Sequence, residues 1–327
     1  MNRPSFSAFA PALVLPALML ATLPTMSFSS WLTLTVAGLA MGMLLFLMAS
    51  GLTLIFGLMD VLNFGHGAFI TFGSYVAVTV LGVLAGWMGA PSLGLNLLAV
   101  AAAIVAAMVA GGVVGVAFER VIVRRVYGNH LRQILITVGG LIVAEQLFVV
   151  FWGPDTITLP KPATLRGAIT IAGANIESYR LLCLALGLVV AGAMQWILTR
   201  TRIGLLVRAG VENREMVEAL GYRIRRLFVA IFAAGSALAA LGGVMWALYQ
   251  ESVTSRMGSD LFVLVLIILI IGGMGSVGGC FVGAILVGLV TNYTGFLLPK
   301  LALGSNIALM VLILLWRPRG LFPVAKW

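Results

Sequence analysis

Three polar residues, Asp60, Asn63 and His66, follow one another at intervals of three in an otherwise apolar stretch. On a helix, that spacing would place their side chains on one face. Polar groups are costly in contact with lipid, so this face should line a water-filled path or contact neighbouring protein. A second interpretation is a polar turn at the end of an apolar helix, where Asn63 and His66 satisfy freed backbone groups.

Glu145 stands inside a long apolar run. An ionisable residue at membrane depth is a functional candidate by default. The alternative is a carboxyl group that is hydrogen-bonded between packed helices. A proton relay would need several such groups in series, and Glu145 is the only one placed well inside an apolar segment.

Other kinds of site chemistry have little support in the sequence. His66 and His130 are the only histidines, and they lie in different segments without nearby cysteines, so a metal site is not expected. No lysine follows a glycine, so the chain lacks the phosphate-binding loop GxxxxGK[ST] and should not hydrolyse ATP by that route. The two cysteines, Cys183 and Cys280, stand in apolar segments and are interpreted as free thiols. We expect neither an enzyme nor a bound cofactor.

Membrane helices must position these residues. Hydrophobic residues make up 61% of the chain, charged residues 9%, and the mean hydropathy is +1.14. This composition excludes a soluble globular domain, and the long apolar runs suit helices that cross about 30 Å of hydrocarbon. We therefore predict an all-α polytopic membrane protein with ten spans. The predicted spans are residues 10–28, 33–58, 67–86, 93–118, 133–151, 179–198, 227–249, 261–271, 280–298 and 303–316.

The distribution of basic residues predicts the orientation. Most of the 20 lysines and arginines lie near the N-terminus, in residues 119–132 and 199–226, and in the closing tail. An excess of basic residues marks cytoplasmic loops in a membrane protein and does not indicate nucleic acid. Both termini and residues 199–226 should therefore face the cytoplasm. The largest loop on the other side, residues 152–178, should form an ordered turn or hairpin.

Two segments interrupt the apolar runs with glycine and polar residues. They are residues 57–73, which contain Gly67, and residues 271–284, which contain Gly272, Gly273 and Gly275. Unwound backbone at membrane depth is tolerated where it lines a cavity or is buried in protein. Paired interruptions in the two halves of a chain point to a transport pathway. In the second segment, the glycines should also allow helices to approach closely.

Residues 199–226 form a polar island between two apolar spans. Glu212, Glu215 and Glu218 would share one face of a helix, and Gly210 and Gly221 bracket it. One interpretation is a loop helix that rests on lipid headgroups, with its arginines bound to anionic lipid. The other is a docking helix that inserts into a groove on a soluble partner.

Four strings resemble the branched-chain amino acid ABC permeases, the LivH-like family. They are GLTLIFGLMDVLNFGHGAFITFGSYVAV (51–78), TRIGLLVRAGVENREMVEALG (201–221), IIGGMGSVGGCFVGAILVG (270–288) and RPRGLF (317–322), in the family's order and spacing. One difference is Ala68, where the family often has an acidic residue. The resemblance implies one transmembrane permease domain, residues 1–327, that contains a cytoplasmic coupling loop, residues 199–226. The coupling residues that it implies are Arg208, Glu212, Glu215, Glu218, Ala219 and Gly221.

The resemblance also implies an assembly in the bacterial inner membrane. Two cytoplasmic ATP-binding subunits would drive transport, a second permease subunit would complete the pathway, and a periplasmic binding protein would deliver a small-molecule substrate. The pathway would include Asp60, Asn63, His66, Gly67 and Glu145, together with the glycines of residues 271–284. The expected cargo is a branched-chain amino acid. Urea, short amides and other small carboxylates are the alternatives within the family.

Two other classes of function remain possible from the residues alone. An ion-driven secondary transporter would use Glu145 and Asp60 as coupling carboxylates and would need no partner. A channel or a non-transporting scaffold is the other. ATP-dependent uptake by an assembled complex would distinguish the family's function from both.

Overall fold

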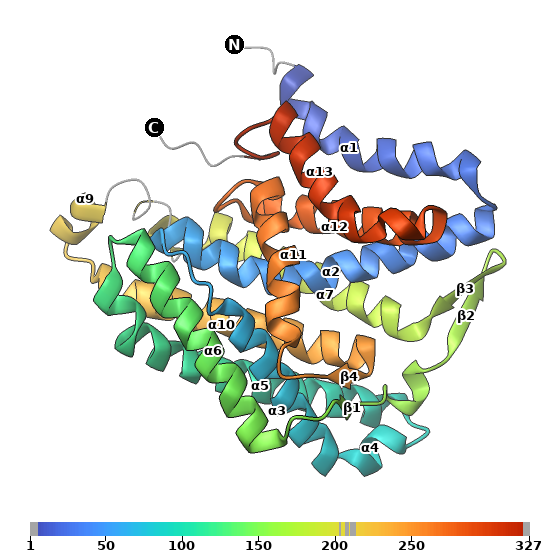
Figure 1. The fold of residues 1–327 in the computed structure, drawn as a ribbon, viewed down its shortest axis with the longest axis horizontal. Coiled ribbons are helices and arrows are strands. Elements are labelled where there is room, and N and C mark those ends of the chain that lie inside the picture. Colours follow the sequence, from blue (N-terminus) through green and yellow to red (C-terminus); the bar gives the residue numbers. More distant parts are fainter. Residues whose placement is uncertain (1–5, 203, 207–208, 210–213, 323–327) are drawn as a thin grey trace.

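The computed structural model describes residues 6–202, 204–206, 209 and 214–322, and most of this part of the chain is helical (Figure 1). The longer helices are α2 (Phe28–Met59), α3 (His66–Val83), α5 (Leu93–Val121), α6 (His130–Trp152), α7 (Ser178–Arg200), α10 (Ile224–Gln250) and α12 (Val277–Leu297). The shorter ones are α1 (Phe6–Thr22), α4 (Ala85–Gly89), α9 (Arg214–Ala219), α11 (Met257–Gly272) and α13 (Ala302–Trp316). Single 3₁₀ turns are η1 (Leu23–Thr25), η2 (Val123–Val126), η3 (Ala163–Leu165) and η4 (Pro299–Leu301).

Within the described residues, 7 helices are long and apolar enough to cross a membrane. The chain is thus a multi-pass membrane protein, as its composition predicts. The other three predicted spans coincide with shorter apolar helices, at Leu13–Thr25, Met257–Gly272 and Gly304–Trp316. The count of ten spans therefore stays a prediction, as does the side of the membrane on which the termini lie.

Helix α2 forms the centre of the bundle and packs along α12 and α10. Small residues make this packing close: a Cβ atom added to Gly42 would lie 2.9 Å from the carbonyl oxygen of Ala284. Helices α5 and α10 are equally close, since a Cβ atom on Gly111 would lie 2.7 Å from that of Ala240. Lipid provides no hydrophobic force between helices, so close approach and dispersion contacts hold them together.

Four short strands complete the described fold. Strands β2 (Ala168–Ile171) and β3 (Ala174–Glu177) form an antiparallel hairpin, which confirms the hairpin predicted within residues 152–178. Strand β1 (Ile157–Thr158) pairs with the distant β4 (Ser252–Val253), so the same loop is also joined to the end of α10. In Figure 1 the hairpin lies at one end of the bundle and α9 at the other.

Candidate functional site

The chain between α2 and α3 is not helical. Helix α2 ends at Asp60, which has a left-handed φ of 51°, and α3 begins at His66. Two side chains of α6 bind the backbone of this segment: the N–H of Leu62 donates to Oε1 of Gln133 at 3.4 Å, and that of Phe64 donates to Oγ1 of Thr137 at 3.1 Å. Irregular backbone inside a membrane protein needs such partners, because lipid offers none.

This break separates the three polar residues that the sequence would place on one helical face. Asp60 is exposed and lies 3.8 Å from His130, whereas Asn63 and His66 are fully buried. The shared face is therefore absent, because the intervening residues are extended and turned. Nε2 of His66 lies 2.9 Å from the carbonyl oxygen of Met48.

The buried polar atoms of Asn63 and His66 are incompletely satisfied. Both amide atoms of Asn63 and Nδ1 of His66 have no hydrogen-bond partner among the described residues. Buried polar groups nearly always have a partner in native proteins, so unpaired ones require an explanation. Here the two side chains contribute a small buried set of donors and acceptors next to the break between α2 and α3.

A second break of equal length separates α10 from α11. Helix α10 ends at Glu251, which also has a left-handed φ, of 55°, and α11 begins six residues later, as α3 does after Asp60. From the sequence, this segment was expected to be a connection between the predicted spans 227–249 and 261–271, and the second interruption was expected at residues 271–284. Within the described residues, interruptions of this kind therefore separate α2 from α3, α10 from α11, and α11 from α12.

The two breaks bring the N-termini of α3 and α11 together. In Figure 1 the two helices leave the centre of the molecule in opposite directions. A Cβ atom on Gly67 would lie 2.7 Å from the carbonyl oxygen of Gly258, and the N–H of Gly258 donates to Oγ1 of Thr71 at 2.8 Å. Oγ of Ser259 donates to the carboxyl group of Glu145. Glu145 is therefore hydrogen-bonded between helices, and Gly67 lies at a backbone contact.

The glycines of residues 271–284 form a different site. Gly272 and Gly258 stand at opposite ends of α11, roughly 21 Å apart at 1.5 Å per residue. Gly273, with a φ of 99°, abuts the chain's closing segment, where the N–H of Phe322 donates to the carbonyl oxygen of Gly272 at 3.0 Å. A Cβ atom on Gly275 would lie 2.8 Å from Cα of Gly57. These close approaches form a packed corner.

A small polar cavity beside the second break was not anticipated. Its volume is about 190 Å³, and Asp260, in the first turn of α11, is its acidic group. The lining residues are Trp246, Gln250, Ser252, Thr254, Met257, Asp260 and Leu261. Asp260 lies just before the predicted span 261–271, and an acidic residue at the edge of an apolar run is the signal that could have identified it.

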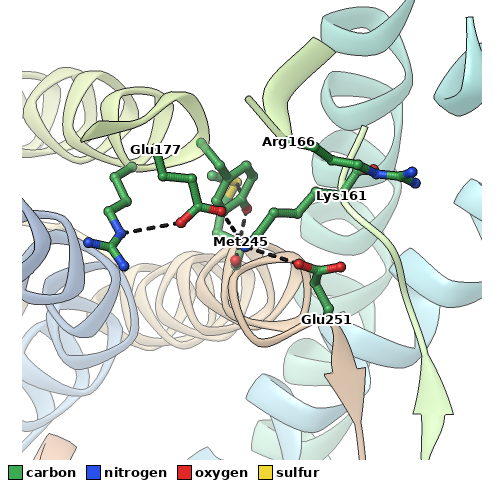
Figure 2. A network of polar contacts seen from close by, with 7 residues as sticks. Lys161, Arg166, Glu177, Met245 and Glu251 are labelled. Carbon is green, nitrogen blue, oxygen red and sulfur yellow. Dashed lines mark hydrogen bonds and ion pairs between the residues drawn. The ribbon is translucent and has the colours of Figure 1, made fainter. Parts of the chain in front are cut away.

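Lys161 anchors a polar network in the loop between α6 and α7 (Figure 2), and this network was not predicted from the sequence. Its Nζ lies 2.5 Å from Glu177 and 3.1 Å from Glu251, between the rings of Tyr179 and Tyr249. Burial alone would lower the pKa of Lys161, but the hydrogen bonds and charges of the two glutamates outweigh it and raise the pKa above its usual range. The network joins the start of α7 to the end of α10.

Helix α9 lies in the polar island. Of the predicted coupling residues, Arg208 and Glu212 lie outside the described residues, and Glu215 is part of the α9 backbone. Glu218, Ala219 and Gly221 are exposed. Gly221, with a φ of 84°, donates its N–H to the carbonyl oxygen of Glu218 and follows the end of the helix.

The apolar residues around α9 divide between two faces. Val217 is 2% exposed, whereas Met216 is 61% and Leu220 is 70% exposed. The helix thus packs on the bundle through one side and presents large apolar side chains on the other. No group of three histidine, cysteine, aspartate or glutamate side chains comes together as a metal site in the described part of the chain.

A family model and several individual relatives are similar to this chain, and they all describe the same kind of protein. Residues 34–316 match the family described as the permease component of the branched-chain amino acid transport system. The permease protein BraD of the high-affinity branched-chain amino acid transport system of Pseudomonas aeruginosa is 27% identical over 88% of this chain and 94% of its own length. The corresponding LivH of Escherichia coli is 26% identical over 87% and 92%. A probable LivH of Methanocaldococcus jannaschii is 26% identical over 85% and 88%. No solved structure matches the chain significantly.

Proposed function

Because this chain belongs to the branched-chain amino acid transport permease family, we propose that it forms the translocation pathway of an ABC importer in the bacterial inner membrane. Two cytoplasmic ATP-binding subunits drive it, a second permease subunit pairs with it, and a periplasmic binding protein delivers the substrate. The whole chain is one transmembrane domain, and residues 199–226 form its coupling loop. The relatives' transport of branched-chain amino acids supports the same cargo here.

One observation carries the coupling proposal: Met216 of α9 and Leu220 just after it are exposed, while Val217 anchors the helix to the bundle. A short helix with a large apolar exposed face fits a groove on a soluble partner. The glutamates predicted at Glu212, Glu215 and Glu218 would border that contact. Helix α10 begins at Ile224, directly after α9, so a displacement of α9 is passed to a long helix.

The pathway proposal rests on the meeting of α3 and α11. The positive ends of two helix dipoles converge at Gly67 and Gly258, which favours a carboxylate nearby. The unpaired amide of Asn63 and ring nitrogen of His66 add hydrogen-bonding groups, and Glu145 adds an acidic one. This combination suits a zwitterionic amino acid. The pathway should bind it weakly, since tight binding would trap the cargo.

The cavity that contains Asp260 is a candidate outer subsite on the same route. It lies where α10 ends and α11 begins, and its 190 Å³ is sufficient for a small solute. Gly272, Gly273 and Gly275 act as a close-packed corner, and we place them at the cytoplasmic end of the route. The hairpin β2–β3 and the segment between α10 and α11 form the docking face for the binding protein.

The test is uptake by the complete assembly in proteoliposomes. Leucine, isoleucine or valine should accumulate only with ATP, the ATPase subunits and the binding protein. Competition by urea, short amides and other small carboxylates decides the alternatives within the family. Uptake by the permease alone on a proton or sodium gradient would instead establish a secondary transporter. Glu215→Arg should abolish coupled uptake while membrane insertion is retained.

A further inference from the structure

Four arginines from two helical regions line one cavity. Arg120 lies in the last turn of α5, Arg124 lies in η2, and Arg225 and Arg226 lie in the first turn of α10. The cavity has a volume of about 620 Å³, and Val229 and Ala230 complete its lining. All four arginines are exposed. Arg225 and Arg226 lie at the end of the proposed coupling loop, but the proposed function gives none of the four arginines a role of its own.

The cavity carries a positive charge that its own lining does not neutralise. No carboxylate is among the described residues that line it. Glu119, next to Arg120 in sequence, is fully buried and accepts a hydrogen bond of 2.6 Å from Oη of Tyr127. Like charges gathered from separate helices repel one another, so the arrangement is suited to an anion. Guanidinium groups bind phosphate oxygens in pairs, which favours a phosphate.

The surroundings of the cavity indicate the source of that phosphate. Along α5, Val109 and Val113 are 62% and 65% exposed and lie on the same face as Arg120. On α10, Ala230 and Ala234 are exposed and lie on the same helix face as Arg226. The cavity therefore continues into an apolar surface along two membrane helices. A soluble protein partner would not cover apolar surface along membrane helices, whereas the acyl chains of a lipid would.

We propose that this cavity is a binding site for an anionic phospholipid. Its phosphate lies among Arg120, Arg124, Arg225 and Arg226, and its acyl chains lie along the exposed faces of α5 and α10. Basic pockets between membrane helices on the cytoplasmic side are suited to such headgroups. The bound lipid would stabilise the position of the first turn of α10, which follows α9 in the chain. This inference depends on the membrane location of the chain and not on its cargo.

The experiment measures lipid retained by the purified permease. Native mass spectrometry and thermal unfolding are recorded with cardiolipin, phosphatidylglycerol or phosphatidylcholine added. The variants are R120Q/R124Q and R225Q/R226Q. The matched control is R125Q/R132Q, which removes two exposed arginines of η2 and α6 that do not line the cavity and lie outside the coupling loop. R120K/R124K keeps the charge but removes the paired N–H geometry.

We expect both cavity variants to lose about tenfold in affinity for the anionic lipids, and the control to change by less than about twofold. The lysine variant should lie between them. Size-exclusion profiles show whether each variant is folded.

Equal losses in the control and cavity variants would overturn the site, because binding would then be non-specific. Equal protection by inorganic phosphate would assign the cavity to a soluble anion. Variants that retain lipid but fail to assemble with the ATPase subunits would assign it to a protein partner. Each of these last two results also refutes the proposal.

Discussion

The contact between α3 and α11 offers a sharp test of the proposed pathway. Gly67→Ala adds one methyl group 2.7 Å from the carbonyl oxygen and 2.9 Å from the carbonyl carbon of Gly258. Ordinary contacts of a Cβ atom are 3.4–4 Å, so the two backbones must separate by about 0.7 Å. The obstructing atoms belong to the backbone, so no side chain can rotate away.

Overpacking of this kind costs about 1–3 kcal/mol, and alanine's better helix propensity offsets up to ~1 kcal/mol. We therefore expect a net loss of about 1–2 kcal/mol in the free energy of unfolding, or about 2–4 °C in Tm. Uptake should fall further than stability, because the displaced N-termini form part of the proposed pathway. Thermal unfolding in detergent and uptake in proteoliposomes measure the two effects.

Gly82→Ala is the matched control in the same helix. A Cβ atom at Gly82 meets nothing within 4 Å, so this variant should be as stable as the wild type or slightly more stable, and should transport normally. If Gly67→Ala behaves like Gly82→Ala in both assays, α3 and α11 do not meet closely at a functional constriction. Gly67→Leu extends the series and should abolish uptake.

Three further predictions concern other parts of the molecule. Leu220→Asp should abolish ATP-driven uptake and binding of the ATPase subunits without unfolding the permease, because its exposed apolar side chain is proposed to fill the partner's groove; normal coupling would contradict this role. Asp260→Asn should raise the KM for uptake, whereas Asp155→Asn, an exposed acid on the outer loop, should not; equal effects would remove Asp260 from the pathway. Lys161→Met should lower the free energy of unfolding by about 2 kcal/mol, because it leaves Glu251 without its ion-pair partner and leaves Glu177 paired with Arg180 alone. The raised pKa of Lys161 means that this stabilisation is complete below about pH 10 and is lost as the pH rises above it, so constant stability of the mutant relative to the wild type up to pH 11 would contradict the assignment.

The composition and the motifs allowed the membrane helices, the hairpin within residues 152–178 and the family to be predicted. Glu145 illustrates the limit of this reasoning. Its place inside an apolar run was evident, but its partner, Ser259, comes from a distant helix. The sequence left open whether Glu145 faces a path or a neighbour. In the structure, Glu145 of α6 accepts a hydrogen bond from Ser259 of α11, which favours the contact with a neighbouring helix.

The shared face predicted for Asp60, Asn63 and His66 was wrong because it required a continuous helix, whereas the alternative prediction of a turn at the end of an apolar helix agrees with the break between α2 and α3. The left-handed φ of Asp60 ends α2 and turns the next residues toward α6. The break after Glu251 was missed for a related reason, since the residues between the predicted spans 227–249 and 261–271 were expected to be a simple connection. Asp60 and Glu251 are separated by the same number of positions as Gly67 and Gly258. The equal spacing has a structural explanation only because α2 and α10 are each followed by a residue in the left-handed conformation.

Helix α10 is the element that can link the coupling segment to the pathway. Its 27 residues extend about 40 Å at 1.5 Å per residue. A continuous hydrogen-bonded helix cannot absorb a rotation internally, so motion must be taken up at its ends. Left-handed residues stand at both ends, Gly221 before it and Glu251 after it. Lys161 holds Glu251 to the outer loop, so a displacement of α9 must either strain that ion pair or move the outer loop as well. If Lys161→Met leaves the permease folded, it should therefore reduce the uptake obtained per ATP hydrolysed more than it reduces ATP hydrolysis. Equal loss of both would show that α10 does not transmit the displacement.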